Sequence, residues 1–231
     1  GVTITLTMIF MFKYYRSIDR IKYAVVLAFF LTLFEGWLGA VLVQTVLNPV
    51  TITLHLFFAL IIVMLLIYAT QEAYYIDNPD SEKNSMYPKA MGKYFTFLAI
   101  ILLVEVILGT EIRGGLEMIR KENPIVDSKF LLRMLGPFKY MHTFLGLLIT
   151  VISSFLWYQL VKKSSSPSWI VVQSSTVILF LILVQIISGE ILVFLKVIPL
   201  IQLFHLWIAS WILGLVSVQY SAWKNSQTFN E

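Results

Sequence analysis

The chain has 231 residues, of which 58% are hydrophobic and 13% are charged, and its mean hydropathy is +0.83. Soluble proteins carry about 25% charged residues, so the composition excludes a water-soluble enzyme, a disordered chain and a nucleic-acid-binding module. It indicates an integral membrane protein. The net charge of +4 needs no nucleic-acid partner, because membrane proteins concentrate Lys and Arg in their cytoplasmic loops. With no Cys, the chain has neither disulfides nor a thiolate metal site.

Apolar runs long enough to cross a membrane define the predicted helices, since roughly 17–25 apolar residues span the hydrocarbon of a bilayer. Six runs reach this length, at residues 23–47, 50–70, 94–110, 140–161, 169–194 and 197–223. A seventh run, residues 1–12, is too short to span. We expect the first part of this helix to lie upstream of Gly1.

The basic residues predict how these helices are oriented. Ten of the 17 Lys and Arg residues fall on one side of the spans, in segments 13–22, 83–93 and 162–163 and at position 224. This side should be cytoplasmic. We therefore expect a multi-pass protein of the plasma membrane, in which the helices that begin near residues 1, 50, 140 and 197 run inward. Segment 111–139 lies on the outer side, where acidic residues offset its basic ones.

The chain contains an internal repeat. Residues 33–60 align with residues 183–210 without a gap at an offset of 150. The alignment matches three pairs of residues that chance seldom matches together, namely Gly39 with Gly189, Pro49 with Pro199, and His55 with His205. Such a repeat indicates a protein built from two related halves.

Extending the repeat predicts the whole architecture. Residues 1–5 align with residues 146–150, so the position equivalent to His142 would lie four residues before Gly1. A further helix would precede it. The predicted fold is an all-α membrane protein with two pseudo-symmetric four-helix bundles, of which the first helix is missing and seven are visible. We expect an incomplete N-terminal bundle at 1–75, a cytoplasmic linker at 76–93 and a C-terminal bundle at 94–231.

The three histidines, His55, His142 and His205, are all predicted to lie in the first turns of inward-running helices. A single His at a helix end is usually an interfacial residue, but three at similar depth near the outer face, two of them at equivalent repeat positions, favour metal ligation. Imidazole is a common axial ligand of haem iron, and haem sites in bundles use side chains from facing helices. Zinc is the alternative metal, but no acidic or Cys partners recur at matching spacing.

Three polar residues occupy corresponding positions within the apolar runs. Glu35, Glu105 and Gln185 each precede a Gly by four residues, so the polar side chain and the Gly share one helix face. Two interpretations stay open for the acidic pair, a hydrogen bond between helices and a proton path. Glu190 has no such counterpart, because Ala40 stands at its repeat position.

The order of these motifs resembles that of the heme A synthase family. The resemblance covers essentially the whole chain and is carried by residues 35–40, 47–49, 53–55, 108–113, 142, 185–189, 199 and 205. It implies two pseudo-symmetric bundles and an oxidoreductase that converts heme O to heme A for cytochrome oxidase assembly, by oxidising a ring methyl group to a formyl group with oxygen from water. Heme O synthase and other assembly proteins are the partners it implies.

The resemblance also assigns roles to individual residues. It implies that His142 and His205 ligate the iron of a haem b cofactor, and that His55 and Gly39 belong to the heme O site. Arg113, at the outer end of its helix, is a candidate partner for a haem propionate, with loop solvation as the alternative. The second substrate-site His and the expected catalytic Glu would precede Gly1.

Two other functions remain as alternatives. A b-type cytochrome that only carries electrons would need the His pairs but no catalytic Glu. A transporter could share the repeat, but it predicts broken helices at the bilayer midplane, and no matching Gly or Pro interruptions occur in the corresponding runs.

Overall fold

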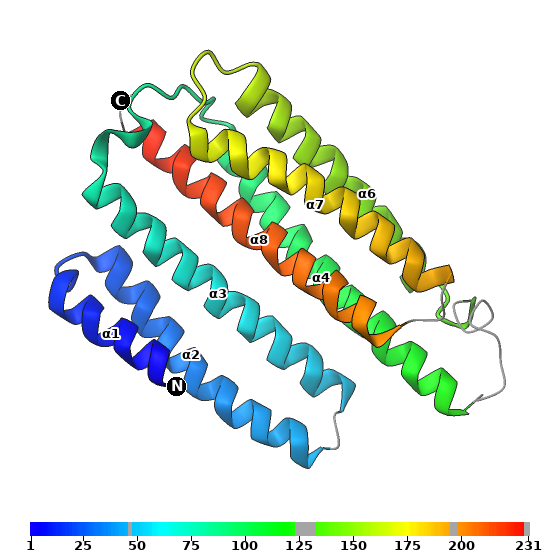
Figure 1. The fold of residues 1–231 in the computed structure, drawn as a ribbon. Coiled ribbons are helices and arrows are strands. Elements are labelled where there is room, and N and C mark those ends of the chain that lie inside the picture. The colour runs from blue at the N-terminus through cyan, green and yellow to red at the C-terminus, as the bar shows by residue number, and fades with distance from the viewer. Residues whose placement is uncertain (46–47, 123–132, 195–197, 229–231) are drawn as a thin grey trace.

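The computed structural model describes residues 1–45, 48–122, 133–194 and 198–228, and within these residues it contains helices and no strands. The predicted all-α fold is therefore confirmed. The α-helices described are α1 Val2–Tyr14, α2 Asp19–Gln44, α3 Pro49–Asp77, α4 Met91–Glu122, α6 Phe138–Trp157, α7 Trp169–Phe194 and α8 Pro199–Gln227 (Figure 1). A short 3₁₀ turn, η1 Pro79–Glu82, follows α3, and a π-helical turn, η2 Tyr158–Lys162, ends α6. By length and composition, six of the helices in this part of the chain could cross a membrane, and α1 is too short.

Several helices are longer than the apolar runs that predicted them. The largest difference is in α4, which continues past the predicted end at residue 110 to Glu122. The added turns bury Leu116 against Leu135, with Ile112 and Ile119 beside them. An apolar stripe of this kind supports a helix outside hydrocarbon, whereas the search for apolar runs finds only the part inside it. The predicted span ends at 47 and 197, and the middle of segment 111–139, lie outside the described residues.

Proline begins the second helix of each copy of the matched repeat. Pro49 and Pro199 are the first residues of α3 and α8. Proline suits this position because its fixed φ matches the helix and its missing N–H would have no helical partner. Before α3, the side chain of Asn48 also accepts a hydrogen bond from the backbone N–H of Val50 at 3.0 Å. Local chemistry therefore sets both helix starts, and with them the depth of the residues that follow.

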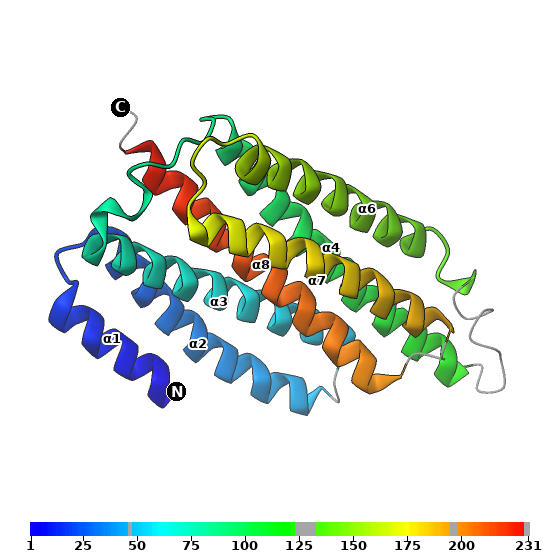
Figure 2. The same cartoon turned by 45° about the horizontal axis from the view of Figure 1, so that its top comes forward.

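The helices form two groups (Figures 1 and 2). In one group, α4, α6, α7 and α8 close a ring in which each helix contacts the next, so that α6 and α8 stand opposite one another. In the other group, α2 packs against both α1 and α3. The groups meet where α3 contacts α4 and α8. A rotation that relates the two groups remains a prediction of the sequence repeat.

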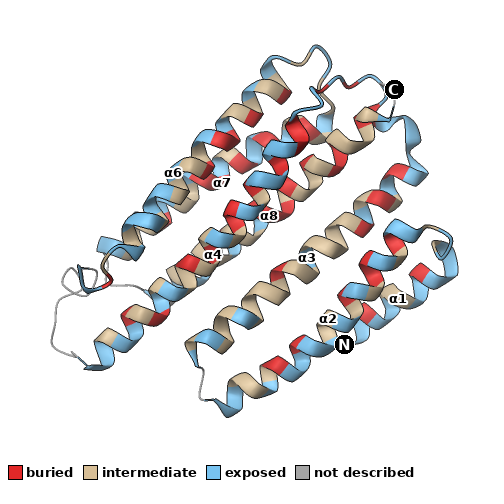
Figure 3. Ribbon diagram, turned by 180° about the vertical axis from the view of Figure 1, so that it is seen from behind, coloured by how far each residue is buried: buried red, intermediate tan, exposed pale blue. Residues whose placement is uncertain are grey.

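Burial differs between the groups (Figure 3). The main hydrophobic core includes Phe95, Leu98, Leu156 and Leu213, all within the ring of four helices. A second, smaller core lies between α1, α2 and α3. Only 6% of the most apolar stretch of α3 is buried, against 28% for α4, α6 and α8. The value for α2 equals that for α7, at 22%, so the difference in burial lies in α3, whose residues are mostly half-buried.

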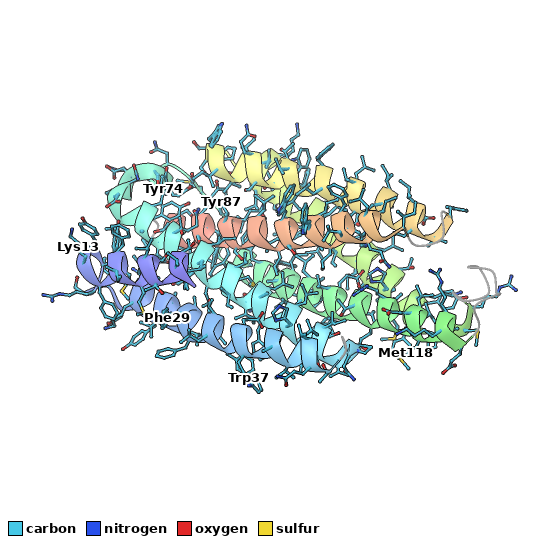
Figure 4. All side chains as sticks on the ribbon, turned by 60° about the horizontal axis from the view of Figure 1, so that its bottom comes forward. Lys13, Phe29, Trp37, Tyr74, Tyr87 and Met118 are labelled. Atoms are coloured by element: carbon cyan, nitrogen blue, oxygen red, sulfur yellow. The ribbon has the colours of Figure 1, made fainter. Side chains whose placement is uncertain are left out.

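The two ends of the helix bundle carry different residues. The connections at 15–18, 78–90 and 163–168 lie together with Lys13, Tyr74 and Tyr87 (Figures 1 and 4), and we call this the basic end. Met118 of α4 lies at the opposite end (Figure 4). Because α3, α6 and α8 begin there, this is also the end at which their histidines lie, and we call it the histidine end.

Candidate haem site

All three histidines lie close to the starts of their helices. His55 and His205 each follow the first residue of their helix, Pro49 or Pro199, by six positions, and His142 lies four positions into α6. At a rise of about 1.5 Å per residue, each histidine is less than about 10 Å from the start of its helix. The three imidazoles therefore occupy a similar depth at the histidine end.

The structure brings two of them together. The ring centroids of His142 and His205 are 6.4 Å apart with their planes tilted by 55°, and the two residues come from opposite helices of the four-helix ring. An imidazole nitrogen that binds a metal at about 2.0 Å puts its ring centroid about 3 Å from that metal, so two such rings on opposite sides of one metal are about 6 Å apart. The observed separation fits a metal held between His142 and His205.

The ligand set favours iron in a porphyrin over a bare metal ion. Within the described part of the chain, no group of three or more His, Cys, Asp or Glu side chains could hold a metal ion. Two imidazoles alone leave most coordination positions of a metal open. A porphyrin supplies the other positions itself and needs only axial ligands from the protein. The residues present thus fit a haem and do not fit a zinc site.

Each histidine packs its Cε1 edge against a glycine of the neighbouring helix. A methyl group on Gly189 would lie 3.4 Å from Cε1 of His205, and one on Gly109 would lie 3.4 Å from Cε1 of His142. In the other group, the corresponding distance from Gly39 to His55 is 3.7 Å. A side chain larger than Ala would push each ring away, so the glycines set how closely the helices hold the imidazoles.

The Nδ1 atoms of two histidines lie against buried carboxyl groups. Nδ1 of His142 is 3.0 Å from Oε1 of Glu105 in α4, and Nδ1 of His55 is 2.8 Å from Oε2 of Glu35 in α2. At these distances the two Nδ1 atoms contact the carboxyl groups without the geometry of a hydrogen bond, and the second oxygen of each carboxyl group also has no hydrogen-bond partner among the described residues. An imidazole held through Nδ1 has Nε2 left to bind a metal.

His205 has a neutral partner instead. Its Nδ1 is 2.8 Å from Oγ of Ser188 in α7, and the Ser188 hydroxyl donates to the backbone carbonyl of Gln185 at 2.9 Å. The same carbonyl also approaches His205. A hydroxyl that donates one hydrogen bond can also accept one from the imidazole N–H. These contacts therefore also leave Nε2 of His205 as the metal-binding nitrogen.

The structure separates the other predicted site residues from this pair. His55 and Gly39 form their own contact between α3 and α2, in the three-helix group. Arg113 lies two turns beyond Glu105 in α4 and is exposed, as is Glu190 in α7. Arg113 is therefore free to meet a charged group at the histidine end, while Glu190 has no place in the histidine contacts.

The histidine partners are the functional residues that the sequence did not predict. Glu35 and Glu105 were expected either to bond between helices or to carry protons, and the structure shows that both reach a histidine on the next helix. Their shared spacing before a Gly was the available signal. Ser188 gave no signal, because Leu38 and Leu108 stand at its matching positions.

Comparison with known proteins identifies a family whose model matches most of the chain. A family model described as cytochrome oxidase assembly protein (COX15-CtaA) matches residues 1–217. This match takes in the seven described α-helices, apart from the last turns of α8, and all three histidines. No curated protein and no solved structure matches the chain.

Proposed function

Because the chain belongs to the cytochrome oxidase assembly protein family, and so has a role in that assembly, we propose that it converts heme O to heme A in the plasma membrane with a haem b cofactor. The observation that carries this proposal is the facing pair His142 and His205, with ring centroids 6.4 Å apart. The pair fits the two axial ligands of one haem. His55, in a separate contact with Glu35 and Gly39, supports a second site for the heme O substrate.

The chemistry needs both sites. When a ring methyl group becomes a formyl group with oxygen from water, four electrons and four protons leave the methyl group and the water. The haem b held by His142 and His205 supplies one-electron redox chemistry when it is bound. An electron acceptor outside the chain must take the electrons finally, because the cofactor cannot store all of them.

The residues of this chain have separate tasks in that scheme. His55 presents Nε2 to the iron of the substrate, because Glu35 occupies its Nδ1. Gly39 keeps the ring close to α2. The surrounding helix faces are apolar and exclude bulk water, which keeps the porphyrin edge in the membrane. Arg113, which is exposed at the histidine end, is a partner for a haem propionate.

The test is the conversion itself. The natural gene is expressed in cells that make heme O but no heme A, and the extracted pigments are separated by chromatography. We expect heme A from the wild-type gene, and none from a His55→Ala variant that still shows a reduced haem b spectrum. If the wild-type protein binds haem b but leaves heme O unconverted, the electron-carrying cytochrome is the better assignment. A wild-type protein without haem b would refute both assignments.

A further inference from the structure

His142 and His205 contact different polar partners through Nδ1, although their neighbouring helices carry polar residues at matching positions. Glu105 and Gln185 stand at matching positions, each four residues before the Gly that its histidine contacts. Glu105 places a carboxyl oxygen against Nδ1 of His142. Gln185 leaves this role to the Ser188 hydroxyl, which lies against Nδ1 of His205, and its own Oε1 has no partner among the described residues.

This difference is not required by helix packing. A carboxyl group inside a membrane is costly, and an amide at the same position could also bond across helices without carrying charge. The chain itself shows that an amide is accommodated, because Gln185 occupies the matching position in α7. We therefore ask what Glu105 contributes that a neutral group would not, and the polar group that it contacts at the site is Nδ1 of His142.

Resting on the proposed haem site, we infer that Glu105 is a positioning residue that fixes the His142 ring through Nδ1 and makes His142 a more strongly electron-donating axial ligand than His205. The structure assigns the same role to Glu35 at His55. His205, held by Ser188, is the neutral ligand of the pair. A haem bound in the four-helix ring would thus be held by two imidazoles with unlike partners.

The physical basis is the close contact of 3.0 Å between the Glu105 carboxyl group and Nδ1 of His142, on the side of the imidazole away from the nitrogen that would bind the iron. A carboxylate that accepts from the ring N–H raises the basicity of the metal-binding nitrogen and fixes the ring orientation. Hydrogen bonds to a charged group are roughly twice as strong as those between neutral groups. In a dry helical bundle both effects are screened less than in water. More electron donation stabilises ferric over ferrous haem and so lowers the reduction potential of the cofactor.

The test is a redox titration of the purified full-length protein, followed by its haem b absorption. Glu105→Gln keeps an acceptor oxygen near Nδ1 but removes the charge, so the spectrum should stay low-spin while the midpoint potential becomes more positive. Ser188→Ala removes a neutral partner and should shift the potential less. Glu190→Gln is the matched control, because it removes a carboxylate from an exposed position on α7 and should leave the potential close to that of the wild type.

A second variant tests whether Glu105 also helps the protein to retain haem. Glu105→Leu removes the charge and the polar contact with Nδ1 of His142 together, and we expect it to retain less haem than Glu105→Gln, at unchanged helix content by circular dichroism. An unchanged midpoint potential in Glu105→Gln, or equal shifts in Glu105→Gln and Glu190→Gln, would overturn the inference. Either result would leave the proposed haem site standing. A wild-type protein that lacks a bis-imidazole spectrum would instead remove the site on which the inference rests.

Discussion

The three-helix group and the four-helix ring hold the same local contact in different surroundings. In both, a histidine near the start of a helix packs against a glycine of the neighbouring helix, and its Nδ1 lies against a polar side chain. In the ring, a second histidine faces the first across a closed core. In the three-helix group, His55 has no second histidine facing it among the described residues, and most residues of α3 around it are half-buried.

The comparison shows that the contacts that hold a histidine and the closing of a site around a porphyrin have different structural requirements. The contact of histidine, glycine and polar partner needs only two adjacent helices, so it forms wherever the helix starts are in register. A closed site that holds both faces of a porphyrin needs all four helices, because His142 and His205 sit on opposite members of the ring and their partners sit on the other two. The ring therefore suits a resident cofactor.

The largest expected effect is the loss of an iron ligand from the four-helix ring. His205→Ala removes one of two axial ligands, so the protein should lose the low-spin bis-imidazole spectrum of haem b. His55→Ala should keep that spectrum, because His55 lies in the other group of helices. Absorption and electron paramagnetic resonance spectra of the purified variants provide the measurement. If the spectrum of His205→Ala were the same as that of the wild type, His205 would not be a ligand.

The next largest effect is expected on the haem affinity when Gly189 is replaced. A methyl group on Gly189 would make only an ordinary contact with His205, at 3.4 Å, so Gly189→Ala should bind haem nearly as well as the wild type. Gly189→Leu should displace the ring and lower haem affinity on the order of tenfold. Haem titration of the apoprotein measures both.

Gly36 offers the matched control for that experiment. A methyl group on Gly36 would meet nothing within 4 Å, so Gly36→Leu adds the same side chain to a membrane helix without touching a histidine. Its haem affinity should equal that of the wild type. Equal losses in Gly36→Leu and Gly189→Leu would point to a general effect on the helices and would contradict the specific contact.

Much of this fold follows from the sequence because the relevant signals are local. Apolar length predicts the spanning helices, and the Gly, Pro and His register predicts that His55 and His205 stand at the same position in α3 and α8, six residues after the starting proline. The extension of α4 to Glu122 was missed, since those turns are held by a narrow stripe around Leu116 and not by continuous apolar sequence.

Contacts between distant helices could not be predicted in the same way. Glu35 and His55 are twenty residues apart and meet only because α2 and α3 pack with a particular rotation about their axes. Sequence periodicity gives the face of a helix but not the partner that this face meets. The bond of Ser188 to His205 was further hidden, because the repeat has no polar residue at the matching positions.

A third effect concerns the link between the two groups. Glu72 in α3 is 3% exposed and pairs with Arg20 of α2 at 2.9 Å and with Lys224 of α8 at 2.7 Å. Removing one member of a buried ion network leaves the others uncompensated, so Glu72→Ala should destabilise the protein by about 2–3 kcal/mol. The estimate is at the lower end because Arg20 is largely exposed. Thermal unfolding in detergent is the measurement.

An exposed ion pair provides the control for the Glu72 variant. Glu117 pairs with Lys121 one turn further along α4, and both side chains are more than half exposed. Such pairs contribute about 0–1 kcal/mol, so Glu117→Ala should unfold close to the wild-type temperature. If Glu72→Ala were no less stable than Glu117→Ala, the network would not hold the two groups together.

The smallest effect is a pH dependence at the connection between the groups. Glu82 lies in η1, outside the spanning helices, and is 1% exposed. Burial raises the pKa of its carboxyl group above the usual value of 4.5, although the hydroxyls of Ser168, Ser85 and Tyr75 favour the ionised form. Because the pKa in the folded state is higher than in the unfolded state, protonated Glu82 stabilises the fold. This stabilisation is complete below about pH 4.5 and is lost as the pH rises through the folded-state pKa.

Glu82→Gln mimics the protonated acid and cannot ionise, so its stability should not fall over this range through that group. We expect the variant and the wild type to unfold at similar temperatures near pH 4, and the variant to unfold about 2 °C higher near pH 8. Asp80→Asn, in the same turn but largely exposed, should follow the wild-type curve at both pH values. Parallel curves for Glu82→Gln and the wild type would mean that Glu82 ionises equally in the folded and unfolded chains. The connection between the groups would then contribute no pH-dependent stability through this residue.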